Sequence, residues 1–363
     1  MRNKKVLIIG GCGFVGANLA SHLKDKFDIS IADNLVRRGS EISLEEFKKQ
    51  RIPFIHCDIR CPEDFNNLGQ YDVILNCAAQ PSAINYSNPV FDITNNTIGV
   101  LNVLEYCRKT GAGLIQWSTN KCYSGVLVNS IPRIEAKDYR AKSRDYIEFF
   151  EWTENTPYKP VPGFNIDKGF NEHLSVDGND HSIYGVSKIA SDLMVQEWSD
   201  AFKINSIVNR FSCLAGPKQW GKAEQGWVTW FAIANELGFP IEIFGFNGMQ
   251  VRDCLFADDL ANLIEKQINS ISKYNGEVFN VGGGMSNAMS LNKAIDLLEH
   301  MNCIFTDIRY GPQRRADQAI YITDITKVSK EFNWKPNTSI EQGYTTILKW
   351  VVDNKNKLTD LYK

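Results

Sequence analysis

The chain has 363 residues, of which 43% are hydrophobic and 23% charged, ordinary proportions for a globular enzyme of one large or two moderate domains. Its 40 basic and 42 acidic residues give a net charge of −2, which provides no basic surface for nucleic acid or for an anionic membrane. No run of residues approaches the roughly 20 apolar positions of a membrane span, and nine scattered cysteines without a C-x-x-C pair are typical of reduced thiols in the cytoplasm.

Short apolar runs alternate with helical patterns through the first two-thirds of the chain. The predicted buried strands are 6–9, 29–32, 54–57, 73–76, 114–117 and 206–210, and the predicted helices between them are 16–26, 95–108 and 182–202. This alternation predicts an α/β fold, a Rossmann-type doubly wound parallel sheet with helices on both faces.

After residue 210 the pattern changes to loops rich in glycine and tryptophan, followed by strands at 241–244 and 277–281 and helices at 291–300 and 340–352. We expect two units: a Rossmann domain made of 1–212 plus about 254–282, and a smaller α/β domain made of about 213–253 plus 283–363. The long polar and aromatic segment 133–180 is either an ordered excursion on the substrate side or a mobile insertion, because loops of this length are usually functional or disordered.

A glycine motif directly follows the first predicted strand. Gly10, Gly13 and Gly16 form G-x-x-G-x-x-G at the start of the next predicted helix. Glycine permits a tight turn and lets a pyrophosphate approach the backbone, and the helix N-terminus adds unpaired N–H groups. Because a strand precedes the motif and an acidic residue ends the next strand, the pattern indicates a dinucleotide site.

The acidic residue is Asp33, whose carboxylate can accept hydrogen bonds from the adenosine ribose hydroxyls. A carboxylate there also repels the 2′-phosphate of NADP, so we expect NAD. Arg37 and Arg38 follow closely, and an arginine in this region can accommodate a 2′-phosphate. The alternative is that these arginines are solvated or contact the cofactor's own phosphates.

Tyr184 and Lys188 are four residues apart at the start of a predicted helix, a spacing that puts both on one helical face. A free tyrosine ionises at about pH 10, and a neighbouring ammonium lowers the pKa of the phenol. Ser118 and Thr119 end the fifth predicted strand, where a hydroxyl can bind the oxygen whose charge changes during hydride transfer. The five histidines have no metal-ligand spacing with the cysteines, so we predict no metal site.

Together these motifs resemble the extended short-chain dehydrogenase/reductases, from about residue 4 to residue 352. The resemblance implies that Thr119, Tyr184 and Lys188 are catalytic and that NAD is bound tightly and recycled. The residues that it implies for cofactor binding are Gly10, Gly13, Phe14, Val15, Gly16, Asp33, Asn34, Arg38, Asp58, Ile59, Ala78, Ala79, Gln80, Asn96, Ser118, Tyr184, Lys188 and Phe211.

The same resemblance implies that the smaller domain binds a nucleotide-diphosphate sugar. Arg252-Asp253 resembles the family's R-D pattern, and Arg314 with Asp317 resembles its R-x-x-D pattern. Guanidinium groups match phosphate oxygens bidentately, although each arginine can instead form a surface salt bridge. The residues implied for substrate binding are Ser82, Asn120, Ser212, Gln225, Arg252, Arg314 and Asp317.

Asn120 and Lys121 follow Thr119 where sugar 4,6-dehydratases have an Asp-Glu pair that water loss requires. The run from Ser118 to Lys121, together with Gln225-Gly-Trp, is similar to the CDP-tyvelose (CDP-paratose) 2-epimerases. The similarity implies an NAD-dependent epimerase that transiently oxidises a nucleotide sugar at C2 to a keto-sugar and returns hydride to the opposite face.

Other functions remain open from the residues alone. The same site suits a nucleotide-sugar 4-epimerase or a nucleotide-sugar dehydrogenase or reductase, and the fold also serves dinucleotide-binding regulators. Relatives often dimerise through the long helices that contain 95–108 and 184–202, so we expect a homodimer or homotetramer in the cytoplasm.

Overall fold

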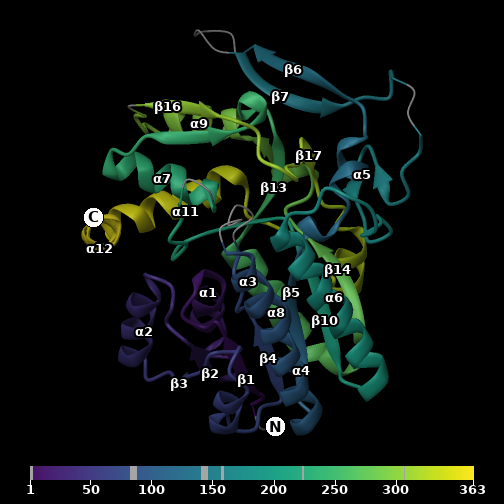
Figure 1. Cartoon of the computed structure of the whole chain (residues 1–363). Helices are drawn as coiled ribbons and strands as arrows, with labels where there is room; N and C mark the ends of the chain where they lie inside the picture. The colour runs from purple at the N-terminus through teal and green to yellow at the C-terminus, as the bar shows by residue number, and fades with distance from the viewer. Residues whose placement is uncertain (1–2, 82–87, 140–145, 157–158, 223–224, 306) are drawn as a thin grey trace.

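The computed structural model describes residues 3–81, 88–139, 146–156, 159–222, 225–305 and 307–363. A seven-stranded sheet occupies the lower half of the molecule in Figure 1, in the order β14-β10-β5-β4-β1-β2-β3 with every neighbouring pair parallel. Its strands are β1 Lys5–Ile9, β2 Asp28–Asp33, β3 Phe54–His56, β4 Val73–Asn76, β5 Gly113–Thr119, β10 Ser206–Phe211 and β14 Asn275–Val281. The strand order reverses between β1 and β4, the crevice in which Rossmann-type folds bind dinucleotides. The predicted fold class is confirmed.

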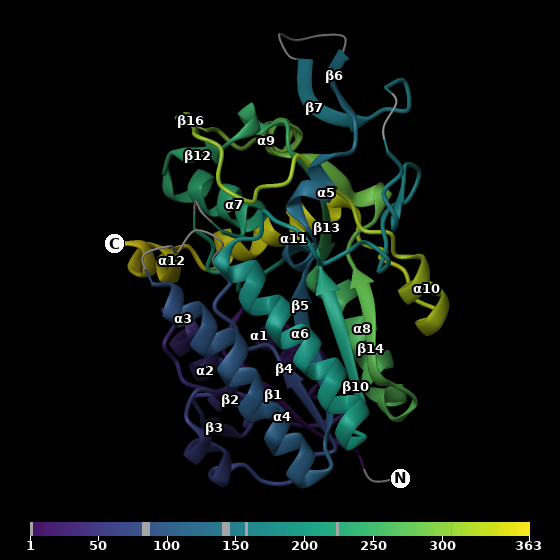
Figure 2. The ribbon, with the colours of Figure 1, turned by 45° about the vertical axis from the view of Figure 1, so that its right-hand side comes forward.

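Helices cover both faces of this sheet because successive strand residues point to opposite sides. Val6 and Ile8 of β1 pack into one core with α1 and α8, whereas Leu7 and Ile9 pack into another with α4 and α6. Figure 2 shows α4 and α6 side by side in front of the sheet. The helices around the sheet are α1 Phe14–Leu23, α2 Ser40–Lys49, α3 Pro89–Ile93, α4 Gly99–Thr110, α6 Ile183–Phe202, α8 Ala257–Ser270 and α10 Thr326–Phe332.

A second, smaller layer lies above the carboxyl ends of the parallel strands (Figure 1). Its central strand, β13, pairs with β11, β15 and β17, and a separate parallel pair joins β12 to β16. The elements are β11 Cys213–Ala215, α7 Trp227–Leu237, β12 Ile241–Phe244, β13 Val251–Phe256, β15 Ala288–Ser290, α9 Leu291–His300, β16 Ile308–Gly311, β17 Ile320–Tyr321, α11 Ile340–Asp353 and α12 Lys355–Tyr362. This layer lies against the edge of the sheet at which the predicted site residues are found.

Helix α7 corrects the sequence prediction, which placed glycine- and tryptophan-rich loops in this region. Gly226 and Gly238, with φ of 72° and 70°, bracket the helix in the left-handed conformation that glycine adopts readily. Between them most side chains are buried, Val228 to Ala234 without interruption. A helix that is apolar on all sides lacks the amphipathic period by which helices are predicted.

The long segment 133–180 is ordered in its described parts. Strands β6 Arg133–Tyr139 and β7 Tyr146–Trp152 form an antiparallel hairpin, and β8 Phe164–Asn165 pairs with β9 Gly169–Phe170. The hairpin stands at the top of both views and contacts α9 and β15. Just before it, α5 spans Gly125–Asn129. Of the two alternatives, the described residues therefore support an ordered excursion from the Rossmann sheet toward the smaller layer.

Candidate active site

The glycine motif forms the turn between β1 and α1. Gly10 has a φ of 72°, and a Cβ added to it would lie 2.6 Å from the backbone nitrogen of Ala78 at the end of β4. Gly13 is the N-cap of α1, and its backbone N–H donates to the carbonyl of Gly10 (3.1 Å). The motif thus leaves an open backbone surface at the start of a helix, directly beside the reversal of strand order. Phe14, Val15 and Gly16 continue it into the first turn of the helix.

Asp33 lies at the C-terminal end of β2 and is 8% exposed. Its two carboxylate oxygens accept backbone N–H bonds from Cys12 (2.9 Å) and Leu35 (2.8 Å). Burial raises the pKa of Asp33, and the backbone hydrogen bonds partly oppose this. The carboxylate therefore joins the glycine turn to the loop after β2, where an acid belongs if it is to hold a ribose.

The loops after β3 and β4 complete this side of the crevice. Asn34 donates to Asp58 (3.1 Å), which also forms an ion pair with Arg60 that lowers the pKa of Asp58. Asn96 accepts from the backbone N–H of Gln80 (2.8 Å) and donates to its carbonyl (2.9 Å). These contacts fix the loop that carries Ala78, Ala79 and Gln80. Ile59 lies buried beneath Gly99. The glycine turn, Asp33 and these fixed loops together fit the binding of a dinucleotide.

The structure separates the two arginines of the loop after β2. Arg37 donates to the side-chain oxygen of Gln80 (2.9 Å) and lies within electrostatic reach of Tyr184 and Asp33. Arg38, the predicted cofactor ligand, donates instead to the backbone carbonyl of Asp360 in α12 (2.9 Å). Of the two, Arg37 is therefore the arginine next to the other candidate residues, and the sequence pattern alone does not distinguish them.

Thr119, Tyr184 and Lys188 come together where β5 ends against the first turns of α6. Thr119 ends β5 and Tyr184 lies in the first turn of α6, and the side chain of Thr119 is close enough to lower the pKa of Tyr184. Lys188 is 1% exposed, and its ammonium donates to the carbonyl of Trp117 on β5 (2.5 Å). Helix α6 starts here because the side chain of its N-cap, Ser182, accepts from the backbone N–H of Gly185 (3.0 Å). The three predicted catalytic residues thus share one location.

Burial sets the ionisation of this pair. It raises the pKa of Tyr184 to about 12, and the hydrogen bond from Thr119 and the charge of Arg37 only partly offset it. Burial also lowers the pKa of Lys188 to about 8, opposed by the nearby carboxylate of Asp192. The sequence analysis expected Lys188 to lower the pKa of Tyr184. In the structure the Lys188 ammonium faces β5, and Thr119 and Arg37 are the groups that lower this pKa.

A buried polar network lies behind Thr119, Tyr184 and Lys188. Asp192, one turn after Lys188 on α6, accepts from Ser118 (2.6 Å) and from two nitrogens of Arg210 on β10 (both 2.9 Å). Arg210 also donates to the hydroxyl of Tyr123 (3.2 Å). Ser118, a predicted cofactor residue, is therefore part of this buried network, and the sequence analysis missed its partners. Asp192 and Arg210 are eighteen residues apart on different elements, and no local sequence motif marks them as partners.

On the substrate side, the loop after β16 docks onto the residues that follow Thr119. Asn120 donates to Gln318 (3.0 Å), and Lys121 donates to the carbonyl of Ala316 (3.1 Å). Arg252 on β13 donates to Asp317 (2.9 Å). Asn120, Arg252 and Asp317, three predicted substrate residues, are therefore brought within one small region next to Thr119. Lys121, which was not predicted as a site residue, lies among them.

The remaining predicted residues are more dispersed. The guanidinium of Arg314 lies 3.9 Å from the ring centroid of Phe244, and Ser212 donates to the carboxylate of Asp253 (2.5 Å). Phe211 is buried and stacks on Trp117 with ring centroids 5.6 Å apart. Gln225 forms an isolated bridge with Lys222, and Ser82 lies outside the described residues.

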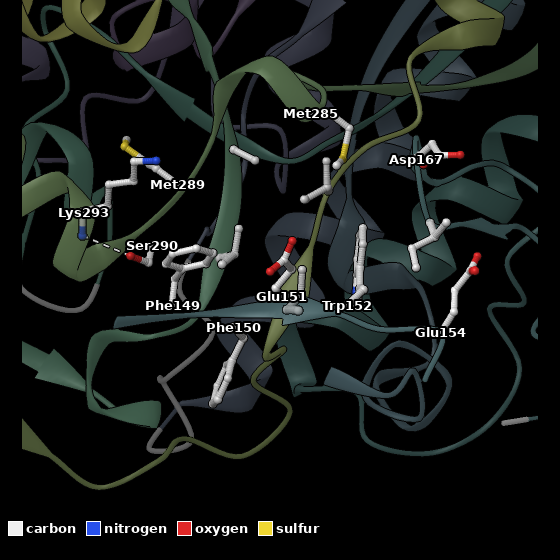
Figure 3. Close-up of a pocket in the computed structure, with 15 residues that line it drawn as sticks. Phe149, Phe150, Glu151, Trp152, Glu154, Asp167, Met285, Met289, Ser290 and Lys293 are labelled. Carbon is white, nitrogen blue, oxygen red and sulfur yellow. Dashed lines mark hydrogen bonds between the residues drawn. The ribbon is translucent and has the colours of Figure 1, made fainter. Parts of the chain in front are cut away.

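A cavity of about 750 Å³ lies beneath the β6–β7 hairpin. Figure 3 shows its lining, with Phe149, Glu151 and Trp152 of β7 facing Met285 and Met289. None of the predicted site residues lines it. The cavity is thus separate from the candidate active site.

Among the residues that the structure describes, no group of three or more His, Cys, Asp or Glu side chains could hold a metal ion, and no helix is long and apolar enough to cross a membrane.

Comparison with known proteins agrees with this geometry. Residues 6–282 match the model of the NAD dependent epimerase/dehydratase family. The chain is 33% identical to a CDP-paratose 2-epimerase of Salmonella typhi over 95% of this chain and 98% of the relative. It is 26% identical to a putative UDP-glucose 4-epimerase of Methanocaldococcus jannaschii, over 96% and 99%. An epimerase structure from Methanothermobacter thermautotrophicus superposes with a TM-score of 0.78 at 20% identity, covering 99% of this chain and 95% of that one.

Proposed function

Because the chain belongs to the NAD dependent epimerase/dehydratase family, we propose that it is an NAD-dependent epimerase of a nucleotide-diphosphate sugar, similar in reaction to CDP-paratose 2-epimerase. One observation carries the proposal: Thr119, Tyr184 and Lys188 meet at the end of β5, between a dinucleotide crevice and a cluster of cationic side chains. When bound, NAD would supply reversible hydride transfer. The sugar would pass through a keto form, and return of the hydride to the opposite face would invert one carbon.

The protein's own residues have separate tasks in this reaction. Tyr184 takes the proton of the sugar hydroxyl and later gives it back, as a general base and then a general acid. The hydroxyl of Thr119 lowers the pKa of Tyr184 in the free site and would turn its single hydrogen to the reacting oxygen when the sugar binds. Lys188 supplies a buried positive charge one helical turn from Tyr184 and would hold the nicotinamide ribose of bound NAD. Because the keto-sugar is reduced again, the net redox change is zero.

The two layers of the fold divide the binding tasks. We assign residues 1–212 plus about 254–282 to NAD, since they contain the glycine turn and Asp33. Residues from about 213–253 plus 283–363 would hold the nucleotide sugar, since they contribute Arg252 and Asp317. The reacting sugar then sits at the junction, against Thr119.

One feature narrows the reaction class. A dehydratase needs an acid and a base in addition to the tyrosine, and this chain has Asn120 and Lys121 after Thr119 instead of carboxylates. A 4-epimerase remains the second candidate, because the same three catalytic groups serve either carbon and one relative is a putative UDP-glucose 4-epimerase. The orientation of the sugar above Tyr184 decides between C2 and C4.

We further propose that the enzyme is a homodimer or homotetramer in the cytoplasm. Val186 and Leu193 are seven residues apart and so lie on one face of α6, and Ile98 directly precedes the neighbouring helix α4 (Figure 2); each of the three side chains is at least 44% exposed. Exposed apolar side chains on adjacent helices are typical of an interface between copies. All nine cysteines are free, as expected in a reducing compartment.

A substrate screen tests the proposed function. The purified protein is incubated with CDP-, UDP- and GDP-sugars, and products and bound dinucleotide are identified by mass spectrometry and NMR. We expect an isomerised sugar nucleotide and NAD that stays with the protein. A stoichiometric release of reduced dinucleotide would show a dehydrogenase, and loss of water from the sugar would show a dehydratase; either result would refute the epimerase.

A further inference from the structure

The loop that follows Asp33, residues 34–39, borders the part of the crevice that we assign to the adenosine ribose. Leu35 packs against the core of the sheet, but its φ of 55° lies in the left-handed region that a leucine rarely adopts. Val36 beside it is 61% exposed. A strained conformation of this kind persists only where surrounding contacts hold it. The contacts made by the rest of the loop therefore decide whether this side of the crevice stays formed.

The end of the loop contacts the smaller layer. The guanidinium of Arg38 donates to the backbone carbonyl of Asp360 in α12 (2.9 Å). Gly39 has a φ of 98° and lies against Trp220, so closely that an added Cβ would be 2.6 Å from the indole ring. The ring of Trp220 packs in turn on Trp350 of α11, with centroids 5.2 Å apart. Because a hydrogen bond from a charged donor is stronger than a neutral one, Arg38 is the main polar tie between the loop and α12.

Glu46 on α2 adds two weaker contacts to the same layer. Its carboxylate lies 3.1 Å from the ammonium of Lys218 and 3.5 Å from that of Lys357 on α12. Lys357 is 48% exposed, and ion pairs at the surface contribute little to stability. They show, however, that α12 lies along both α2 and the loop before it, as Figures 1 and 2 also show.

Helix α12 is itself bound to the smaller layer. Leu358 is fully buried in the core of that layer. The hydroxyl of Tyr362 donates to the carbonyl of Gly221, and Lys355 forms an ion pair with Glu236 of α7 (2.7 Å). The loop next to the NAD site is therefore joined, through α12, to the layer that we assign to the nucleotide sugar.

Arg37 holds the same loop from the other side. It donates to the side chain of Gln80, which belongs to the loop after β4 (2.9 Å). Because β1 lies between β2 and β4 in the sheet, this bond passes over the end of β1, where the glycine turn begins. The two neighbouring arginines thus anchor the loop in opposite directions, Arg37 across the crevice and Arg38 to α12.

We propose that α12 is a clasp that keeps the loop 34–39 closed over bound NAD, with Arg38 as the residue that positions the loop. The inference rests on the binding of NAD in the proposed function. Because that reaction regenerates NAD in every cycle, a crevice that stays closed does not slow turnover. The sugar enters elsewhere, next to Thr119. The clasp therefore slows the release of NAD without blocking exchange of the sugar nucleotide.

The test measures the release of NAD from the full-length protein. Each variant is loaded with radiolabelled NAD, mixed with an excess of unlabelled NAD and passed through a rapid desalting column at successive times. Arg38→Met removes the bond to α12, and Arg38→Lys keeps a charged donor. Leu358→Ala loosens α12 from its opposite side without touching the loop. R51M and L298A are the matched controls, because Arg51 is exposed beyond the end of α2 and Leu298 is buried in the same core as Leu358 but on α9.

We expect R38M and L358A to release NAD roughly 10-fold faster than wild type, the effect of one hydrogen bond to a charged group. R38K should restore part of the slow release, and both controls should stay close to wild type. Hydrogen–deuterium exchange should become faster at residues 34–40 in R38M and L358A, and at residues 355–363 in L358A. If L358A does not fold or leaves exchange in α12 unchanged, L361A replaces it, since Leu361 is also buried on α12.

Each contrary result has a distinct meaning. If R38M and L358A release NAD at the wild-type rate, the clasp is refuted while the proposed function stands. If only R38M releases NAD faster, although exchange shows that α12 is loosened in L358A, then Arg38 is a direct ligand of NAD and the clasp is again refuted. Release from L298A as fast as from L358A would assign the effect to a general loss of stability and would also refute it. A wild-type protein that binds no NAD would overturn the proposed function itself.

Discussion

Asp192 on α6 and Arg210 on β10 form a bidentate ion pair with two N–O distances of 2.9 Å, and their side chains are 1% and 8% exposed. The pair lies one helical turn from Lys188 and holds Ser118 by a third hydrogen bond. It therefore fixes α6 against β5 and β10. A buried pair of this kind is costly to break because it leaves one charge without a partner.

Removal of one partner should destabilise the fold strongly. We expect Asp192→Ala to reduce the free energy of unfolding by about 3–5 kcal/mol, since Arg210 would remain buried and unpaired. Urea denaturation followed by circular dichroism measures this. The double variant Asp192→Leu with Arg210→Met should recover much of the loss, because it removes both charges. If the single variant is as stable as wild type, the pair does not hold the helix in place.

Tyr184 should be indispensable for turnover and dispensable for binding. We expect Tyr184→Phe to lower kcat roughly 10²- to 10⁴-fold, the usual contribution of general acid–base catalysis. Binding of NAD, measured by calorimetry, should remain close to wild type because the ring is kept. Turnover near the wild-type rate in this variant would contradict the role assigned to the phenol.

Asp33 should decide between NAD and NADP. Asp33→Asn keeps the shape of the side chain but removes the charge that repels a 2′-phosphate. We expect weaker NAD binding and a smaller preference for NAD over NADP, both measured by calorimetry. Arg37→Ala serves as a comparison, since Arg37 rather than Arg38 lies near the crevice. An unchanged ratio of the two affinities in Asp33→Asn would refute the ribose role.

Much of the Rossmann half could be predicted because its signals are local. The buried strands are short apolar runs, and every predicted strand of the sheet differs from the observed one by at most two residues at either end. The glycine turn, Asp33 and the Tyr184–Lys188 spacing each lie within one element or one turn. The site they form follows from the parallel topology, which collects strand ends at one edge.

The parts that could not be predicted depend on contacts between distant segments. Arg37 and Arg38 are neighbours in the chain, and only the position of α12 shows that Arg38 donates to Asp360 whereas Arg37 donates to Gln80. In the sequence Lys121 is recognisable only as part of the run from Ser118 to Lys121, because its partner Ala316 comes from a loop nearly two hundred residues later. The β6–β7 hairpin lies in a polar segment without a clear alternation, and its packing on α9 and β15 is what orders it.

The most direct test of the central claim is the reaction of the purified enzyme with its nucleotide sugar in deuterated water. The sugar hydrogen that leaves the reacting carbon should return to the same carbon without exchange with solvent, because Tyr184 moves only the hydroxyl proton. NMR and mass spectrometry of the product should therefore show an inverted centre without deuterium on carbon. Deuterium at that carbon would mean a carbanion or enol route and would contradict epimerisation by transient oxidation.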